Sequence, residues 1–277
     1  MAQVENKDTL HYIFIGHPYQ WHTVGNKIDS RLEQLDFSRY KGIWLGGDVC
    51  SEALLEFFTL EYLDEIIDLG NPANHWTLGN HDARNDNFDL LKKFTGRDTY
   101  YTYADQNMVL IVMNTNLVPS NCEDLDKQYF MIKNVCDTIQ HASHLFLIMH
   151  HGIWRGVPDL PNPSSYAHSD LLYWNANCYS INSRFVDSIY PMLVEVNVRG
   201  ITVICIIGDM GSNGKIFQQQ SVDGIYFLGC GLNNSYYTDP VERAAAEKDR
   251  VLIFKNIPAE RKITWNFCDL DSLLSAQ

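Results

Sequence analysis

The chain has 277 residues, 45% hydrophobic and 20% charged, which excludes a disordered protein. Its formal net charge of −13 disfavours non-specific binding to nucleic acid, because an acidic surface repels phosphates. The most apolar strand-like run, Ile201–Ile207, is too short to span a bilayer, and Met1–Leu10 has no signal-peptide character. We therefore expect a cytoplasmic protein without a membrane span.

Six short apolar runs predict buried strands, each bounded at its C-terminal end by Gly, Asn, Asp or His. These runs are Tyr12–Ile15, Gly42–Leu45, His75–Leu78, Val109–Met113, Leu145–Met149 and Val203–Ile207. Helices are predicted between them at Glu52–Leu69, with Ser51 as its N-cap, at Leu125–His141 and at Arg184–Val198. This alternation predicts an α/β architecture.

The pattern changes after Gly208, where strand-like runs follow one another with little helix between them. They are Lys215–Gln220, Gly224–Leu228, Arg250–Phe254 and Lys262–Phe267. We expect them to form a second sheet packed on the first. The stretch Gly152–Ile181 is loop-like and long, as functional lids and binding loops are.

The seven cysteines are scattered along the chain without a CxxC pair. An odd number in a chain of this size predicts reduced, mostly buried thiols rather than a disulfide frame or a cysteine metal site.

Polar residues of metal-ligand type follow five of the predicted strands. The runs are Gly16-His17-Pro18-Tyr19, Gly46-Gly47-Asp48, Gly79-Asn80-His81-Asp82, His150-His151-Gly152 and Gly208-Asp209-Met210-Gly211. In an open α/β sheet, ligands bind beyond the carboxyl ends of the strands, so these side chains can converge. Carboxylate, amide and imidazole together suit manganese, iron or zinc.

The order Gly-Asp, then Gly-Asn-His-Asp, then His after an apolar strand resembles the calcineurin-like metallophosphoesterase superfamily. Asn114-Thr115 and the segment from Asp126 to Gln128 agree with the resemblance. It implies an α/β sandwich of two mixed β-sheets flanked by helices. It also implies a single domain over residues 1–277, with an inserted loop at about 152–182 near the active site.

The resemblance implies a role for each motif residue. Asp48 would bridge two metal ions, and Asn80 and His150 would ligate the second. His81 would contact the phosphate and assist departure of the leaving group, and Asp82 would orient the His81 ring. The implied reaction is metal-dependent hydrolysis of a small phosphorylated metabolite, such as a sugar phosphate, with one or two divalent ions.

Two motifs depart from the superfamily pattern. Where Asp-x-His is usual, the chain has His17 and Tyr19, and where Gly-His-x-His is usual, it has Asp209 and Gly211. The second metal keeps a full set if Asp209 replaces one imidazole. The first keeps only His17 and Asp48, with His22 or Gln20 as candidate recruits. We hypothesise that a carboxylate has exchanged sides between positions 17 and 209.

Several assignments stay open at this point. His151 could be the ligand in place of His150, and both His17 and Asp209 could be ordinary turn residues. Arg155, Tyr19 and Trp154 are candidates for substrate contact, although Arg155 could be solvated. The loop aromatics Trp154, Tyr166 and Trp174 could simply hold the loop together.

Two other functions are compatible with the altered motifs. The chain could be a scaffold or interaction protein that has lost catalysis, although a scaffold has no need for His81. It could also hydrolyse a cyclic nucleotide or another phosphodiester. The oligomeric state is not predicted.

Overall fold

The computed structural model describes residues 9–168, 171, 174–180 and 182–277. Their strands form two mixed sheets, with the orders β11-β10-β1-β2-β3 and β4-β5-β6-β7-β9-β8. The first sheet consists of β1 (Leu10–Ile15), β2 (Gly42–Leu45), β3 (His75–Trp76), β10 (Arg250–Ile257) and β11 (Lys262–Asp269). The second consists of β4 (Tyr101–Asp105), β5 (Met108–Val112), β6 (His144–Met149), β7 (Thr202–Ile207), β8 (Ile216–Gln220) and β9 (Tyr226–Cys230).

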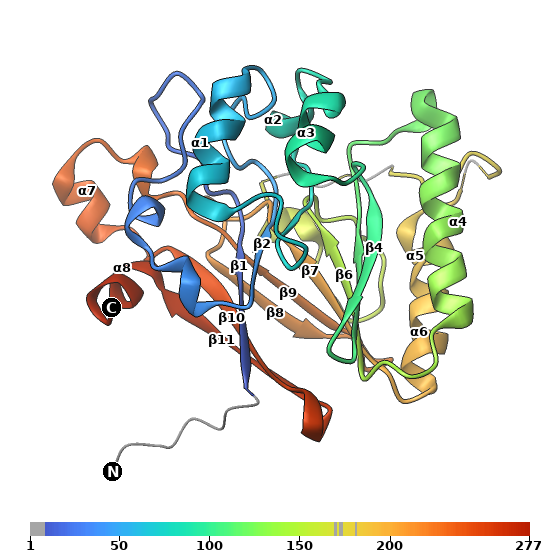
Figure 1. Ribbon diagram of the computed structural model, residues 1–277. Coiled ribbons are helices and arrows are strands. Elements are labelled where there is room, and N and C mark those ends of the chain that lie inside the picture. Colours follow the sequence, from blue (N-terminus) through green and yellow to red (C-terminus); the bar gives the residue numbers. More distant parts are fainter. Residues whose placement is uncertain (1–8, 169–170, 172–173, 181) are drawn as a thin grey trace, which may run out of the picture.

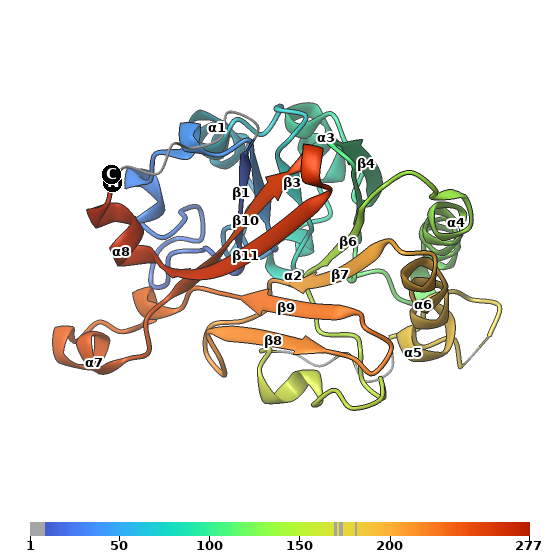
Figure 2. The ribbon, with the colours of Figure 1, turned by 90° about the horizontal axis from the view of Figure 1, so that it is seen from below.

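The C-terminal strands divide between the two sheets, so the expected sheet of C-terminal strands alone was wrong. β10 pairs antiparallel with β1, whereas β9 pairs parallel with β7 and antiparallel with β8. Figure 2 shows β10 and β11 beside β1, with β9 and β8 continuing the other sheet. Both sheets therefore combine N-terminal and C-terminal strands.

Helices cover the outer faces of both sheets. Their bounds are α1 Phe57–Ile67, α2 Asn80–Ala83, α3 Phe88–Thr95, α4 Cys122–Thr138, α5 Phe185–Ser188, α6 Tyr190–Val198, α7 Pro240–Ala245 and α8 Leu270–Ser275. Figure 1 shows α4, α5 and α6 together along one flank of the molecule, away from α1. The expected sandwich of two mixed sheets flanked by helices is thus confirmed.

The strand side chains alternate between a central core and two outer cores. In β1, Tyr12 and Phe14 face the other sheet, whereas Ile13 and Ile15 pack beneath the α1 layer. In β6, Phe146 belongs to the central core and its neighbours on both sides pack beneath α4 and α6. Strands buried on both faces read as continuous apolar runs, which is why the sequence revealed them.

Two local expectations differ from the structure. The first helix begins at Phe57 rather than Glu52, because residues 51–55 form turns beside the loop that carries Asp48. Cys122 and Cys178 form a disulfide, so the expectation that all thiols are reduced was wrong. The two cysteines are far apart in sequence, and their meeting depends on how residues 174–180 fold back onto the start of α4.

No helix among the described residues is long and apolar enough to cross a membrane. The expected single-domain organisation and cytoplasmic location stay predictions.

Candidate metal centre

A cluster of carboxylates and imidazoles lies beyond the ends of β1, β2, β6 and β7. The Asp48 Oδ2 atom lies 3.6 Å from Nε2 of His17 and 3.5 Å from Nε2 of His150. The same nitrogen of His150 lies 3.8 Å from Oδ1 of Asp209. All four residues are buried. The structure therefore brings four of the five predicted ligands, Asp48 included, into one cluster.

Glycines at the strand ends allow the two sheets to meet here. A Cβ atom on Gly208 would lie only 2.0 Å from the carbonyl oxygen of Gly46. His17 and Asp48 have positive φ angles of 50° and 52°, which are uncommon for residues other than glycine. Such backbone conformations concentrate at functional sites, where surrounding contacts hold them.

The His150 ring is oriented so that its Nε2 atom points into the cluster. Its Nδ1 donates to the carbonyl oxygen of Gly46 at 2.7 Å, which leaves Nε2 facing Asp48 and Asp209. This Nε2 atom is buried and makes no hydrogen bond of normal length among the described residues. Burial alone would lower the pKa of His150, but the charges of Asp48 and Asp209 raise it to about 10.

Asp48 is held as an anion. Burial alone would raise the pKa of its carboxyl, yet the neighbouring His150 and His17 rings lower the pKa well below its usual range. Its Oδ1 atom accepts the backbone N–H of His81 at 2.9 Å, which leaves Oδ2 turned toward the histidines.

His151 packs against the His150 ring and contacts Asn80. The His151 ring contacts the Thr115 hydroxyl through Nδ1 at 2.7 Å and Oδ1 of Asn80 through Nε2 at 3.3 Å. Ligand atoms of His150, His151 and Asp209 lie within 4.8 Å of one another. Burial and the charge of His150 lower the pKa of His151 to about 3, so the His151 ring is neutral.

Asp82 has a different partner from the one expected. Its carboxylate accepts the backbone N–H groups of Asp48, Val49 and Gly79 and the indole N–H of Trp76, at 2.7–3.1 Å. Burial and the charge of Asp48 raise the pKa of Asp82 to about 7. The expected role of Asp82 in orienting the His81 ring is therefore corrected: this carboxylate fixes the loop that carries Asp48.

His81 lies at the rim of the cluster, oriented by other groups. Its Nδ1 lies 3.1 Å from the carbonyl oxygen of Ser51, which can only accept a hydrogen bond. Nη2 of Arg84 lies 3.1 Å from Nδ1 and 3.5 Å from Nε2 of the same ring. The Tyr19 ring packs against His81, with centroids 5.2 Å apart. Arg84 follows His81 by one helical turn, and the sequence reasoning overlooked it.

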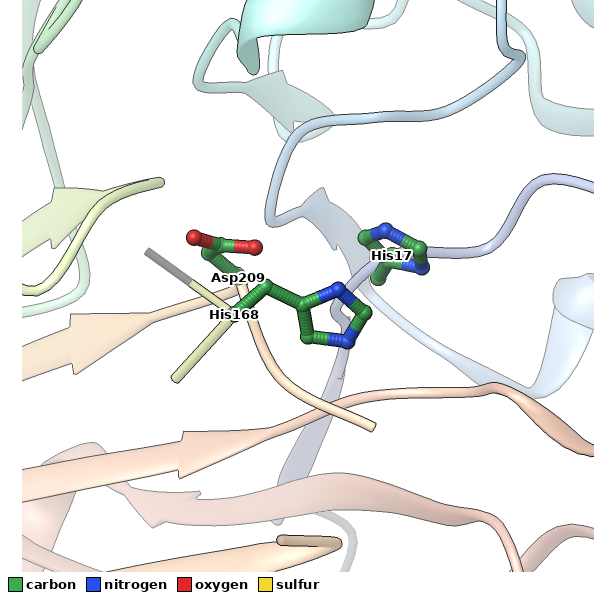
Figure 3. A group of neighbouring side chains, drawn as sticks. All are labelled: His17, His168 and Asp209. Carbon is green, nitrogen blue, oxygen red and sulfur yellow. The ribbon is translucent and has the colours of Figure 1, made fainter. Parts of the chain in front are cut away.

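His168 joins His17 and Asp209 from the long loop, and the sequence reasoning overlooked it too. Ligand atoms of these three residues lie within 4.8 Å of one another, and Figure 3 shows the His168 ring extending toward His17. The rings of His17 and His168 have centroids 4.5 Å apart. Burial lowers the pKa of His17 to about 4 and also lowers that of His168.

A histidine cannot take the place of Gly211. Its φ angle is 130°, and a Cβ atom there would lie 2.6 Å from the carbonyl oxygen of Leu232. The segment at 231–233, which follows β9, fills the space that a side chain at 211 would need. The backbone therefore leaves no room for a ligand side chain at position 211.

The structure gives different environments to the residues that we expected to contact substrate. Trp154 is 1% exposed, stacks on Phe217 and donates from its indole to the carbonyl oxygen of Pro161, so it is a core residue and its expected contact with substrate is corrected. Tyr19 is buried against His17 and His81. A role for Arg155 stays a prediction. His22, a candidate recruit, turns its Nε2 to the carbonyl oxygen of Tyr236 instead.

Neither a protein-family model nor a curated protein matches the sequence. Among solved structures, the chain is similar to crystal structures of a single and a double mutant of Vps29 from Entamoeba histolytica. The identities are 12% and 13% and the TM-scores 0.37 and 0.36, over 94% of this chain and 99% of each Vps29 chain. These similarities are too low to transfer a function, so the chemistry of the site has to supply it.

Proposed function

We propose that the protein is a metal-dependent phosphoesterase of the calcineurin-like type, with one divalent ion held by Asp48, Asn80, His150 and Asp209. The observation that carries this proposal is the buried Nε2 of His150, which faces two carboxylates and makes no hydrogen bond of normal length to any described residue. Buried polar atoms are almost always bonded, so a buried ring nitrogen between two carboxylates suggests a binding position for a cation.

The spacing of the oxygens and nitrogens favours an ion over direct contacts. Distances of 3.5 Å and 3.8 Å from Nε2 of His150 to the carboxylates are too long for hydrogen bonds. Two ligands at about 2.1 Å from one tetrahedral cation lie about 3.4 Å apart. Protonation of His150 would also neutralise the carboxylates, but it would leave those separations unexplained.

The chain fixes these donors in ligating form. The carbonyl oxygen of Gly46 holds the proton of His150 on Nδ1, as carbonyls commonly do for histidine ligands. Imidazole together with carboxylate and amide oxygens suits manganese, iron or zinc. When bound, such an ion would polarise a phosphoryl oxygen and lower the pKa of a water molecule.

Residues at the rim would act on the leaving group. His81 is partly exposed beside Asp48, and its Nδ1 lies 3.1 Å from both the carbonyl oxygen of Ser51 and Nη2 of Arg84. When the ring is protonated, its Nε2 could deliver a proton to the departing oxygen. The Arg84 guanidinium lies against the same ring and supplies positive charge suited to phosphate. The substrate class is a small phosphorylated metabolite.

The test is an assay of an aryl phosphate and an aryl phosphodiester with added manganese, together with measurement of bound metal. We expect one ion per chain and turnover of the monoester. His81→Ala should lower the rate by about 10²–10⁴-fold, because general acid catalysis contributes that much, while metal content stays unchanged.

His141→Ala is the matched control, since His141 is exposed and outside the cluster. It should leave rate and metal content at the wild-type level. Faster turnover of the diester would change the substrate class to a phosphodiester. Absence of bound metal and of turnover with every divalent ion would contradict the proposal and leave the scaffold function.

A further inference from the structure

The loop that precedes α5 is anchored to the segment after β7 at the point where it carries His168. The backbone N–H of His168 donates to the carbonyl oxygen of Asp209 at 2.9 Å, and Ala167 forms an antiparallel bridge with Met210. The Asn213 side chain donates to the carbonyl oxygen of Ala167 at 2.8 Å. Backbone contacts therefore fix the position of His168 beside the candidate metal centre.

The same segment determines which ring nitrogen of His168 carries the proton. The backbone N–H of Ser212 points at Nε2 of His168, at 3.0 Å. A backbone N–H can only donate, so Nε2 must offer its lone pair, and the neutral ring carries its proton on Nδ1. A protonated nitrogen has no lone pair for a cation, so this hydrogen bond opposes metal ligation through Nδ1.

The Nδ1–H group of His168 lies in a part of the cluster where two positions lack the ligand side chains of the superfamily pattern. Positions 19 and 211 hold a tyrosine and a glycine, and the nearest imidazole, that of His17, is fully buried. His168, in contrast, is only partly buried. Figure 3 places its ring between Asp209 and His17, next to the carboxylate that the proposed ion would share.

We propose that His168 is a catalytic residue that donates a hydrogen bond from Nδ1–H to a phosphoryl oxygen of the substrate and does not ligate metal. This inference rests on the proposed function, because it requires a phosphate ester bound beside the ion at His150. The centre then uses one cation on the His150 side and a neutral donor on the His168 side. A donor aimed at charge that develops in the transition state accelerates the reaction.

The first experiment reads the proton directly and needs no variant to be active. Protein labelled with 15N-histidine is examined by long-range 1H–15N correlation without metal and with one equivalent of zinc, and His168→Phe assigns the signals. We expect His168 to show the Nδ1–H tautomer in both states. A zinc-induced shift of its Nδ1 to the value of a coordinated nitrogen would overturn the proposal.

The second experiment compares metal content, turnover and binding of inorganic phosphate in three variants. His168→Phe keeps a ring without a donor, and His168→Asn keeps an N–H near the position of Nδ1. We expect one ion per chain in both, a rate about 10²-fold lower in His168→Phe, and partial recovery in His168→Asn. Phosphate binding to the zinc-loaded protein should weaken in the same order, and His141→Phe should match wild type.

The outcomes separate this proposal from the proposed function. A wild type that holds two ions, one of which is lost in His168→Phe, makes His168 a ligand and overturns the inference alone. Wild-type turnover and phosphate binding in a folded His168→Phe protein also overturn it alone. A wild type without metal and without turnover overturns the proposed function, and the inference falls with it.

Discussion

The carboxylate of Asp82 accepts the backbone N–H of Asp48 at 2.7 Å. The two residues belong to different motifs, and the contact joins them into one unit. Asp48 has a positive φ angle, and three further donors to Asp82 keep the surrounding loop in that conformation. The Gly-Asn-His-Asp run thus contributes to the metal centre partly by shaping the backbone that presents Asp48.

Replacing Asp82 by asparagine should weaken both folding and metal binding. An amide has a single acceptor oxygen, and its NH2 group would face N–H donors that are now paired. We expect the free energy of unfolding to fall by about 2–4 kcal/mol and metal affinity to fall by about 10–100-fold. Urea unfolding and metal titration check this. Asp86→Asn, at an exposed position with positive φ, should change neither, and equal effects in both variants would contradict the assignment.

A side chain at Gly211 should be costly. Gly211→Ala combines a φ angle of 130° with a clash against the carbonyl oxygen of Leu232, so we expect a loss of about 3 kcal/mol or more. Gly96→Ala is the matched control, because Gly96 also has positive φ but has open space around it. Its loss should be about 1 kcal/mol. Similar losses in thermal or urea unfolding would show that the clash is relieved.

Acid should destabilise the protein through His75. Burial, with a smaller contribution from Arg97, lowers the pKa of His75 to about 3, whereas the unfolded value is about 6.5. Between these values the unfolded chain binds more protons, so stability is full above pH 6.5 and falls as the pH drops toward 3, by at most about 1.4 kcal/mol per pH unit.

His75→Phe should reduce this slope, because phenylalanine does not titrate and fills a similar volume between Trp44 and Tyr103. Urea unfolding at several pH values between 4 and 7 measures it. His141→Phe, at an exposed position, should keep the wild-type slope. An unchanged slope in His75→Phe would mean that other groups carry the acid dependence.

Removing the disulfide should lower the free energy of unfolding of the protein. Cys122 and Cys178 are 56 positions apart, and closing a loop of that size stabilises a protein by about 2–4 kcal/mol. Cys178→Ser should therefore lower the free energy of unfolding under non-reducing conditions, and dithiothreitol should lower that of wild type equally. Cys268→Ser removes a free thiol and should respond to reductant as wild type does. Insensitivity of wild type to reductant would argue against the bond.

The sequence allowed prediction of the strands and of the ligands at their ends because both depend on local pattern. Gly42–Leu45 is buried on both faces and reads as an apolar run, and Asp48 follows it directly. His150 could be placed for the same reason, at the end of β6. The sequence favoured His150 over His151 as the ligand, and the structure adds that Nδ1 of His150 contacts the carbonyl oxygen of Gly46, which turns Nε2 toward Asp48.

Long-range pairings escaped sequence reasoning. An apolar run does not specify its neighbour, so nothing in Tyr226–Cys230 predicted that β9 would pair with β7. His168 lies in an irregular loop, and only its backbone contacts with Asp209 bring it to the cluster. The exchange of carboxylate and imidazole between positions 17 and 209 stays a hypothesis, although the two side chains do lie together.

Metal content after removal and reloading of the ion is the most direct test of a metal centre at His150. Wild type, His150→Ala, Asp209→Asn and the control His141→Ala are stripped with chelator, reloaded with manganese or zinc, dialysed and measured by elemental analysis, with circular dichroism confirming that each is folded. We predict one ion per chain in wild type and His141→Ala, and far less in His150→Ala and Asp209→Asn. Equal metal content in all four proteins, or none in wild type, would contradict a metal centre at His150.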